Sequence, residues 1–511
     1  MEERSDTAAG YLEDAAHFPG GHAAGIVFPQ TAGEVADAVA AHQAILPIGA
    51  QSSLTGGATP MGETILSTSR MRRVVEVTRK RITVEPGVTV AEMQEVLGET
   101  DSWFAPAPTF TGACAGGIVA TNAAGAATFK YGSTRSWVEA LRVVLADGTM
   151  LHVTRGRTTA TDCRLRVERS RGTVDVPVPG YRVPNVPKVS AGYYSAPDLD
   201  LIDLFIGSEG TLGVITEITF GVMSPAPVVA LAFVPCPGLE TGLSLVADLR
   251  AQSLRTRTQH DRGGIDAAAI EHMDRRSLQI LRDDGVDRAH NVSIPVETEL
   301  ALLVQLELPA GTTDERAFED IQNATDATPL GRFCRVLEAH GVFNDSEIAL
   351  PGQRRRMADF IAVREAVPAG VNRRVGDAKR TIDSRIEKTA GDMIVPFEHF
   401  GTLLEIYRDG LEARGLDFAV WGHISDGNVH PNVIPRSLED VASGKEAMIA
   451  FGAAVARLGG CPLAEHGVGR NPVKQRLLQN LYGADGIDQM RAVKRALDPE
   501  WKLAPGVLFD P

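Results

Sequence analysis

The 511-residue sequence is 44% hydrophobic and 23% charged, and 51 Lys and Arg against 65 Asp and Glu give a formal net charge of −14. This composition predicts a folded chain of two or three domains. An acidic chain without a long basic run argues against nucleic acid as a partner. The five cysteines form no C-x-x-C pair, which argues against a disulfide framework and against a four-thiolate iron–sulfur cluster.

The N-terminus is acidic and no apolar core segment follows it, so we expect no secretory signal. This pattern predicts a cytoplasmic location, either free or peripheral at the membrane. The longest uncharged stretch, residues 102–129, contains two prolines and four glycines. Because these residues break a spanning helix, we expect no transmembrane segment.

In chain order, the first 220 residues combine short β-rich runs with helical patterns and predict an α+β domain. Helices are expected at Thr31–Gln43 and Thr89–Leu97, where a glutamate three residues after the threonine suggests a capping box. Strands are expected at Arg81–Glu85 and Leu141–Leu145, each followed by a turn signal. Residues 154–188 carry seven arginines without clear periodicity and predict an exposed loop or arm.

Two closely spaced prolines, Pro225 and Pro227, indicate a boundary after the first domain. Beyond it, longer helical patterns predict helices at Ile265–Arg282 and Asp314–Ala324. An apolar run predicts a strand at Ala301–Leu308. No internal repeat is visible, so the chain is interpreted as consecutive domains.

A loop rich in glycine and hydroxyl side chains, residues 47–60, follows a short apolar run. Its backbone N–H groups can form an anion nest to which Ser52, Ser53 and Thr55 add donors, an arrangement that suits a pyrophosphate. The loop is neither a G-x-x-x-x-G-K-[ST] motif nor a G-x-G-x-x-G motif. Taken alone, it is equally well interpreted as an ordinary glycine-rich turn.

Two further loops of small residues occupy positions 111–125 and 207–216. In the first, closely spaced glycines and alanines let the backbone approach a flat ligand, while Thr121 and Asn122 can fix the edge of that ligand. The second loop precedes a β-rich run. Three such loops in one domain favour a long dinucleotide with a planar ring system over three unrelated turns.

These loops, with Pro86-Gly87-Val88 and Tyr131-Gly132, resemble the flavin domain of the vanillyl-alcohol oxidase/p-cresol methylhydroxylase (PCMH) superfamily. The closest likeness is to its D-lactate dehydrogenase and glycolate oxidase subunit branch. The resemblance implies an α+β fold and FAD, held noncovalently because no motif marks a histidine for covalent attachment. The implied order is a PCMH-type FAD-binding domain at 20–222, an α+β substrate (cap) domain with a metal hairpin at 223–455, and a C-terminal helical segment at 456–511 that returns to the FAD domain and completes the active site.

The resemblance also implies which residues contact FAD. These are Pro47, Gly49, Ala50, Gln51, Ser52, Ser53, Pro86, Gly87, Thr111, Gly112, Gly116, Gly117, Thr121, Asn122, Gly125, Tyr131, Gly132, Glu209, Gly210, Gly213, Val214 and Ile215. Ala50 and Gln51 stand where the branch usually has glycines. Residues 154–188 are longer than usual in the branch, a difference that would alter contacts with a partner.

A strong local motif, residues 421–434, contains two apolar half-strands around Asp426-Gly427, a pair favoured in type I′ hairpin turns. With the turn at that pair, opposed residue numbers sum to 853, so His423 faces His430 directly and Asn432 lies on the same face. At a Cβ separation of about 4.5–5.5 Å, two imidazoles can share one divalent ion. Two stacked surface histidines are the alternative interpretation.

A second motif places Glu465 beside His466 ahead of two glycines. His423, His430 and Glu465 would form a ligand set with open positions, as a catalytic metal site needs. In the resembled branch the matching positions form a metal site beside the flavin, although Ser425 replaces a usual glycine here. We expect a divalent metal, with zinc as the first choice and manganese, iron or cobalt as alternatives.

The resembled branch also supplies cations for a substrate carboxylate. Arg364 matches an arginine motif of the branch, and Lys388 precedes the segment 392–396 as it does there. An arginine can hold a carboxylate through two parallel hydrogen bonds. The cations between these two positions are interpreted as a solvated helix face, and they are Arg373, Arg374, Lys379, Arg380 and Arg385.

Together these features predict FAD-dependent oxidation of a D-2-hydroxy acid of the D-lactate, glycolate or D-2-hydroxyglutarate class. In this scheme His466 is the base, Arg364, Lys388 and Asn432 complete the catalytic set, and hydride passes to flavin N5. No haem or iron–sulfur motif is present, so the electron acceptor would be a quinone, a cytochrome or an electron-transfer protein, and a homodimer is compatible with the chain. The alternatives are an FAD-dependent oxidase of a phenol or another alcohol, and a non-catalytic metal-binding or electron-transfer subunit.

Overall fold

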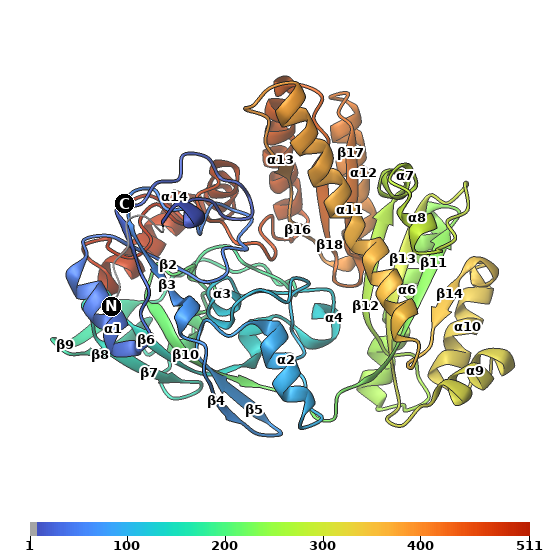
Figure 1. The fold of residues 1–511 in the computed structure, drawn as a ribbon, viewed down its shortest axis with the longest axis horizontal. Helices are drawn as coiled ribbons and strands as arrows, with labels where there is room; N and C mark the ends of the chain where they lie inside the picture. Colours follow the sequence, from blue (N-terminus) through green and yellow to red (C-terminus); the bar gives the residue numbers. More distant parts are fainter. Residues whose placement is uncertain (1–7) are drawn as a thin grey trace. The chain divides into compact units, whose positions relative to one another are not determined.

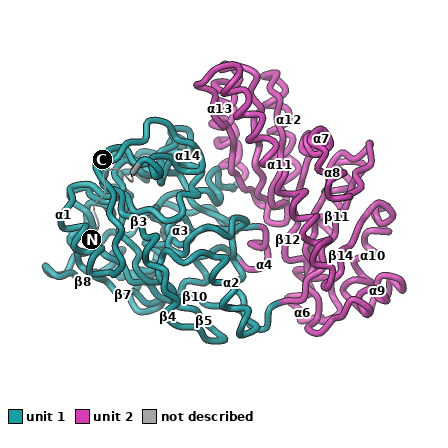
Figure 2. The backbone as a smooth tube through the Cα atoms, viewed as in Figure 1, with its two compact units in different colours: residues 1–125, 132–226, 459–511 teal, residues 126–131, 227–458 magenta. Residues whose placement is uncertain are grey.

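The computed structural model describes residues 8–511, which form two compact units (Figure 1; Figure 2). Of the described residues, unit 1 contains 8–125, 132–226 and 459–511, and unit 2 contains 126–131 and 227–458. The chain therefore passes repeatedly from one unit to the other, and its C-terminal segment belongs to the same unit as its N-terminal half. The mixed helix and sheet architecture confirms the predicted α+β class.

Unit 1 is built on two main sheets and a separate hairpin. A parallel sheet has the order β1-β3-β2, and an antiparallel sheet has the order β4-β5-β10-β6-β7. The strands are β1 (Gly25–Val27), β2 (Ile45–Ile48), β3 (Thr64–Ser67), β4 (Val74–Val77), β5 (Arg81–Val84), β6 (Val138–Val144), β7 (Met150–Thr154), β8 (Arg164–Arg169), β9 (Gly172–Pro177) and β10 (Val214–Gly221).

The helices of unit 1 begin at side-chain caps. Thr31 caps α1 (Ala32–Ala41) by accepting from Glu34 N, and Thr89 forms a full capping box with Glu92 at α2 (Val90–Gly98). Both predicted helices are therefore confirmed. The remaining helices are α3 (Ala115–Ala120), α5 (Leu201–Phe205), α14 (Pro472–Leu497, kinked at Gly483), and the 3₁₀ turns η1 (Ala8–Tyr11), η2 (Thr68–Arg70) and η3 (Thr134–Trp137).

The C-terminal segment is part of the core of unit 1. Ile45 N donates to Lys502 O at 2.8 Å, and Ala504 N donates to Ile45 O at 2.7 Å. Leu503 packs in the same apolar cluster as Val27 and Val39. Residues 502–504 thus extend the parallel sheet beside β2.

Residues 154–188 are not an exposed loop or arm throughout, as their arginine content and lack of periodicity predicted. Their centre is the β8–β9 hairpin, in which Leu165, Val167 and Val176 are buried while arginines project to solvent. The alternation of buried and exposed side chains along β8 is the strand period, but it extends over only six residues. The prediction of a loop was therefore wrong for the hairpin.

Unit 2 is built around one long antiparallel sheet of order β14-β11-β13-β12-β17-β18-β15, with β16 also paired to β18. The strands are β11 (Val228–Cys236), β12 (Ala267–Asp274), β13 (Leu300–Leu308), β14 (Glu347–Ala349), β15 (Thr389–Ala390), β16 (Met393–Ile394), β17 (Phe418–His423) and β18 (Asn428–Val433). Helices α7 (Arg275–Asp283) and α11 (Arg354–Thr381) pack on one face of this sheet, where Phe233, Met273 and Trp421 form a core with Phe360 and Val367.

The helices of unit 2 are α4 (Thr128–Tyr131), α6 (Leu239–Gln259), α7 (Arg275–Asp283), α8 (Val286–Ala289), α9 (Asp314–Asn323), α10 (Pro329–Ala339), α11 (Arg354–Thr381), α12 (Phe400–Glu412) and α13 (Leu438–Arg457), with the 3₁₀ turns η4 (Phe343–Asp345), η5 (Phe397–His399) and η6 (Ile424–Asp426). The predicted strand at 301–308 and helix at 314–324 are confirmed as β13 and α9.

One helix predicted in unit 2 is confirmed only in its second half. Residues 265–282 were expected to be helical throughout, but their first half is β12 and only their second half is α7. The alanine-rich start has high helix propensity, yet β12 lies between β13 and β17 with seven of its eight residues buried. Tertiary pairing in the middle of a sheet overrides that local preference.

Within residues 8–511, no helix combines the length and the apolar character that crossing a membrane requires. All five cysteines lie in the described residues, where each is a free thiol and only Cys163 is exposed.

Candidate active site

The glycine-rich loops of unit 1 pack against one another. A Cβ added to Gly49 would lie 3.1 Å from Cys114 Cβ, and one added to Gly116 would lie 2.7 Å from Pro86 Cβ. A Cβ at Gly210 would lie 3.3 Å from Pro47 Cγ. The structure therefore brings together the four segments around residues 47–53, 86–87, 111–117 and 209–210, from which sequence analysis predicted a shared ligand.

The glycines of these loops serve two different purposes. Gly125 and Gly213 are required by packing, since an added Cβ would lie 2.7 Å from Ala107 O or 2.3 Å from a Val143 methyl. A Cβ at Gly117 would meet nothing within 4 Å. The backbone at Gly117 thus leaves room for a flat group to approach, which fits the dinucleotide that the sequence predicted.

The polar side chains of the second loop bond to the protein itself. Thr121 Oγ1 donates to Gly117 O at 3.0 Å. Asn122 Oδ1 accepts from Arg135 N at 2.9 Å, and Asn122 Nδ2 donates to Val189 O at 3.3 Å. These bonds hold the loop backbone in place, including Asn122 at a φ of 49°. Contact of either side chain with a ligand stays a prediction.

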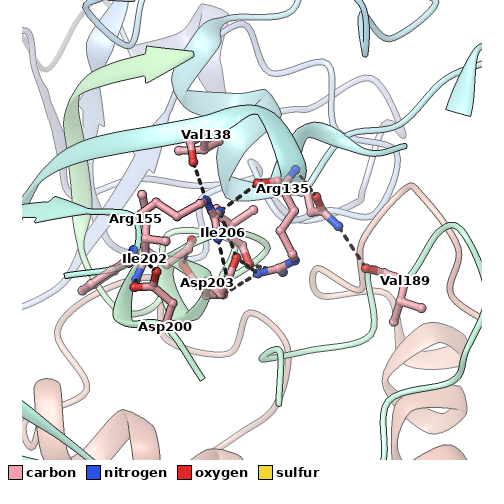
Figure 3. A network of polar contacts seen from close by, with 12 residues as sticks. Arg135, Val138, Arg155, Val189, Asp200, Ile202, Asp203 and Ile206 are labelled. Carbon is pink, nitrogen blue, oxygen red and sulfur yellow. Dashed lines mark hydrogen bonds and ion pairs between the residues drawn. The ribbon is translucent and has the colours of Figure 1, made fainter. Parts of the chain in front are cut away.

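An arginine–aspartate network (Figure 3) is joined to this loop through the bond from Arg135 N to Asn122. Asp203 Oδ1 accepts from Arg135 at 3.1 Å, and Asp203 Oδ2 accepts from Arg155 at 3.0 Å. Arg135 also donates to the carbonyls of Asp203 and Ile206, and Arg155 donates to Val138 O. The network ties the loop at 117–125 to α5 and to the start of the third glycine loop.

Glu209, in the third glycine loop, anchors the C-terminal segment. Its carboxylate accepts from Val468 N at 2.7 Å and from Gly469 N at 2.8 Å. Burial raises the pKa of Glu209 to about 7, although the two N–H donors lower it. The predicted contact of Glu209 with a cofactor stays a prediction, because both carboxylate oxygens are already engaged within the protein.

In the first loop, Gln51 has a positive φ of 51°, a conformation that favours glycine. Its Nε2 donates to Tyr11 O and to Ala58 O, each at 2.9 Å. Gln51 therefore closes the loop on itself and on the N-terminal segment. Ser53 Oγ lies 3.1 Å from Thr55 Oγ1.

The predicted pair Glu465 and His466 lies in unit 1, where Glu465 contacts a cation that sequence analysis missed. Lys188 is fully buried, and its Nζ donates to Glu465 Oε2 at 3.0 Å. His466 Nε2 lies 3.5 Å from Glu465 Oε1 and its side chain is 28% exposed. Lys188 was placed at the end of an exposed arm, and this prediction was wrong. A lysine between Pro187 and Val189 carries no sequence signal of burial.

The hairpin that carries the two predicted metal-binding histidines has a different register from the predicted one. His423 pairs with Asn428 and Trp421 pairs with His430, so opposed residue numbers sum to 851. The connection is the 3₁₀ turn η6 followed by Gly427 at a φ of 89°, not a type I′ turn, because Asp426 does not have a positive φ. The shift moves the partner strand by two residues and therefore preserves the face on which each side chain lies.

His423 and His430 consequently remain neighbours, as diagonal rather than directly opposed residues. Their ring centroids are 5.7 Å apart at an interplanar angle of 88°. His423 Nδ1 lies 2.5 Å from Glu271 Oε1, and His430 Nδ1 lies 3.6 Å from Asp392 Oδ1. Each imidazole thus has a carboxylate beside it, which is the usual environment of a metal-binding histidine.

Asn432 lies on the same face of β18 as His430 and is 1% exposed. Its Nδ2 donates to His430 O at 2.9 Å, whereas its Oδ1 accepts no hydrogen bond from residues 8–511. A buried oxygen without a donor is costly unless a ligand or water satisfies it. The nitrogen and oxygen donors of this face therefore fit a divalent metal with a bound oxygen ligand.

Arg364 lies on α11, and its Nε donates to Glu271 Oε2 at 2.6 Å. Glu271 is thus shared by Arg364 and His423. Burial raises the pKa of Glu271, but the charges of Arg364 and His423 outweigh burial and lower it to about 2. Glu271 was missed because it lies in β12, which was predicted to be helical. The available signal was a pair of adjacent ionisable residues, Glu271 and His272, between apolar residues at 267–270 and Met273.

The other predicted residues of unit 2 are less closely grouped. Lys388 is exposed and precedes β15, and Tyr131 Oη donates to Glu307 Oε1 at 2.5 Å. Of the cations that follow, Arg373, Arg380 and Arg385 pair with nearby carboxylates and have side-chain exposures of 53%, 70% and 71%, whereas the side chain of Arg374 is 23% exposed. These exposures favour the solvated helix face that the sequence suggested.

Comparison with known families divides the chain into two matched regions. Residues 23–154 match the family described as FAD binding domain, and residues 240–508 match the family described as FAD linked oxidases, C-terminal domain. The chain is also similar along most of its length to a solved structure titled alkyldihydroxyacetonephosphate synthase, with a TM-score of 0.56, 15% identity, and coverage of 94% of this chain and 76% of that chain. That likeness confirms the fold.

Curated relatives cover the chain at low identity. It is 26% identical over 479 residues to glycolate oxidase subunit GlcD of Bacillus subtilis, covering 91% of this chain and 83% of the relative. It is 26% identical to D-2-hydroxyglutarate dehydrogenase of Xanthomonas citri pv. viticola, covering 91% and 84%. It is 25% identical to D-lactate dehydrogenase of Archaeoglobus fulgidus, covering 90% and 84%.

Proposed function

The chain belongs to the FAD-linked oxidase family, and on that premise we propose that it oxidises a D-2-hydroxy acid to the corresponding 2-keto acid. The relatives reported above are named for glycolate, D-lactate and D-2-hydroxyglutarate, which are all 2-hydroxy acids. A quinone, a cytochrome or an electron-transfer protein would then take the electrons.

The mutually packed glycine loops of unit 1 support a noncovalent FAD site. The open backbone at Gly117 and the loop at residues 47–53 are the elements that would hold the ring system and the pyrophosphate. Bound FAD would supply the hydride acceptor at flavin N5. The Arg135–Asp203–Arg155 network would keep the second loop rigid against the cofactor.

The observation that carries the metal-assisted part is the pair His423 and His430 on one buried face, with Asn432 Oδ1 beside them and lacking a donor. We assign these imidazoles as ligands of a divalent metal, zinc being the first choice, and keep Glu465 as the third ligand that the sequence predicts. Such a metal would make the substrate hydroxyl more acidic.

Two cationic or basic side chains would act on the substrate directly. Arg364 is tied to Glu271 through Nε, so its Nη groups would hold the substrate carboxylate with their N–H donors. His466 would accept the proton of the C2 hydroxyl on a ring nitrogen while the C2 hydride departs. Lys388, being exposed, would contribute to the attraction of an anionic substrate.

An anaerobic substrate panel tests this function. The purified yellow protein is mixed with D-lactate, D-2-hydroxyglutarate and glycolate, with the L-enantiomers and with phenols, and the loss of flavin absorbance is followed. At least one D-2-hydroxy acid or glycolate should bleach the flavin, and phenols should not. Bleaching by a phenol alone would establish the alternative alcohol oxidase, and a yellow protein that no member bleaches would contradict a dehydrogenase.

Two variants separate the roles of the adjacent residues Glu465 and His466. Glu465→Gln removes a ligand charge and should weaken metal binding together with flavin reduction. His466→Asn should keep metal and FAD but slow flavin reduction by about 10²–10⁴-fold, as loss of a general base does. Metal content and single-turnover reduction are measured in parallel. Reduction of His466→Asn at the parent rate would reject His466 as the base.

A further inference from the structure

Glu271 stands at the point where the sheet of unit 2 meets α11. It is paired directly with His423 across the antiparallel strands β12 and β17. The side chains of Glu271 and His423 are 7% and 2% exposed, and that of Arg364 is 12% exposed. All three groups are therefore held where solvent cannot compete for their hydrogen bonds.

The two oxygens of Glu271 are divided between two partners. Oε1 lies 2.5 Å from His423 Nδ1, and Oε2 accepts from Arg364 Nε at 2.6 Å. A carboxylate can only accept hydrogen bonds, so His423 must carry a proton on Nδ1. This arrangement leaves the lone pair of the neutral ring on Nε2, the atom that can bind a metal.

The carboxylate of Glu271 also determines which nitrogen atoms of Arg364 can bind a substrate. Because Glu271 bonds to Nε, the guanidinium is anchored at that nitrogen, and the edge between its two Nη groups would serve a substrate carboxylate. Those groups can form the two parallel bonds that a planar carboxylate accepts. One buried acid thus sets the orientation of a metal ligand and of a substrate-binding arginine.

We propose that Glu271 is a positioning residue that fixes the Nδ1-protonated form of His423 for metal binding and orients Arg364 for the substrate carboxylate. This inference rests on the proposed function, since it assigns Glu271 to the same site. It adds a residue that contacts neither metal nor substrate but acts through both of the groups that do.

The substitution Glu271→Gln leaves one of the two hydrogen-bond donors, Arg364 or His423, without an acceptor at position 271. The amide of glutamine has one acceptor oxygen and one donor NH₂, so it cannot accept from both Arg364 Nε and His423 Nδ1. Arg364 is always protonated, so the amide oxygen of the new glutamine turns toward it. The amide NH₂ then faces His423 Nδ1 and favours the neutral ring form that carries its proton on Nε2. That form lacks the lone pair that the metal needs, and Zn²⁺ affinity should fall about 10–100-fold.

The test is a calorimetric titration of Zn²⁺, and separately of Mn²⁺, into chelator-treated protein that retains FAD. Asp274→Asn is the matched control, because Asp274 is a partly buried acid on the same strand that instead accepts from Ser277 N at 2.8 Å and from Val420 N at 2.9 Å. Glu271→Gln should bind metal about 10–100-fold more weakly than the parent, while Asp274→Asn should match the parent.

A second pair of variants keeps the test decisive if Glu271→Gln does not fold. Glu271→Met/Arg364→Met replaces both buried charges with apolar groups of similar size, an exchange that proteins often tolerate. It should fold and bind Zn²⁺ as weakly as Glu271→Gln. Arg364→Met alone leaves Glu271 on His423, so it should keep the parent metal affinity and lose substrate affinity, seen as a raised KM.

The outcomes separate the inference from the function on which it rests. Parent-like Zn²⁺ affinity in Glu271→Gln, or in the double variant, would overturn the positioning role and leave the proposed function intact. A parent protein that binds neither Zn²⁺ nor Mn²⁺ would overturn the metal site and the inference together. A loss of metal affinity in Asp274→Asn equal to that in Glu271→Gln would show that any disturbance of β12 suffices, which also contradicts the proposal.

Discussion

His272, the neighbour of Glu271 on β12, should make unit 2 sensitive to acid. Its side chain points to the opposite face of the strand, is 2% exposed, and packs edge-on against Phe400 with ring centroids 6.4 Å apart. Its Nδ1 has no hydrogen-bond partner among residues 8–511. Burial lowers the pKa of His272 to about 4, and the negative charge of Glu271 only partly opposes this.

The sign of the effect follows from where the proton binds. The ordinary pKa of 6.5 applies to the unfolded chain, so between pH 6.5 and about 4 the unfolded state binds a proton that the folded state does not. The free energy of unfolding therefore falls as the pH is lowered through this window. At about 1.4 kcal/mol for each pKa unit, the full loss is about 3 kcal/mol.

The measurement compares the parent with His272→Leu, which cannot bind the proton. Urea unfolding at several values between pH 7 and pH 4 gives the free energy of unfolding of each protein. The variant should lose about 3 kcal/mol less than the parent over this range, whatever its stability at pH 7, because the other titrating groups are common to both. Between pH 7 and pH 9 the free energies of unfolding of the parent and of His272→Leu should change in parallel. Parallel curves down to pH 4 would refute the reasoning.

Three further outcomes are expected from the buried charges and the proposed metal. Lys188→Met leaves the carboxylate of Glu465 buried without its cation and should cost about 3–5 kcal/mol in the urea unfolding of unit 1, part of which Lys188→Met/Glu465→Leu should restore. Asp203→Ala removes the acceptor shared by Arg135 and Arg155, so it should destabilise unit 1 by a similar amount and lower the FAD that survives gel filtration, whereas an unchanged FAD content would contradict the role of the network. Dialysis against a chelator should slow substrate-dependent flavin reduction without releasing FAD, and Zn²⁺ or Mn²⁺ should restore the rate; full activity with no bound metal would reject the metal-assisted step.

The elements that the sequence predicted correctly are those set by local interactions. The helices at 32–41 and 90–98 begin where a threonine and a glutamate three residues apart can satisfy backbone N–H groups, and these bonds need no distant partner. The glycine loops were recognisable for a similar reason, because their small residues and hydroxyls are adjacent in the chain. Even the histidine hairpin kept its two imidazoles on one face, because a shift of two residues does not change side-chain parity.

The features that the sequence left undecided depend on partners that are far apart in the chain. Glu271 and His423 are 152 residues apart and meet only because β12 pairs with β17, and an alanine-rich segment becomes that strand only because the sheet buries it on both sides. Lys188 and Glu465 are 277 residues apart, and no local pattern marks either as half of a buried ion pair. Local hydrogen bonding and side-chain alternation are visible along a sequence. Burial and the pairing of remote strands, in contrast, are properties of the assembled core. Only the tertiary structure could therefore show which charged residues support the proposed ligands.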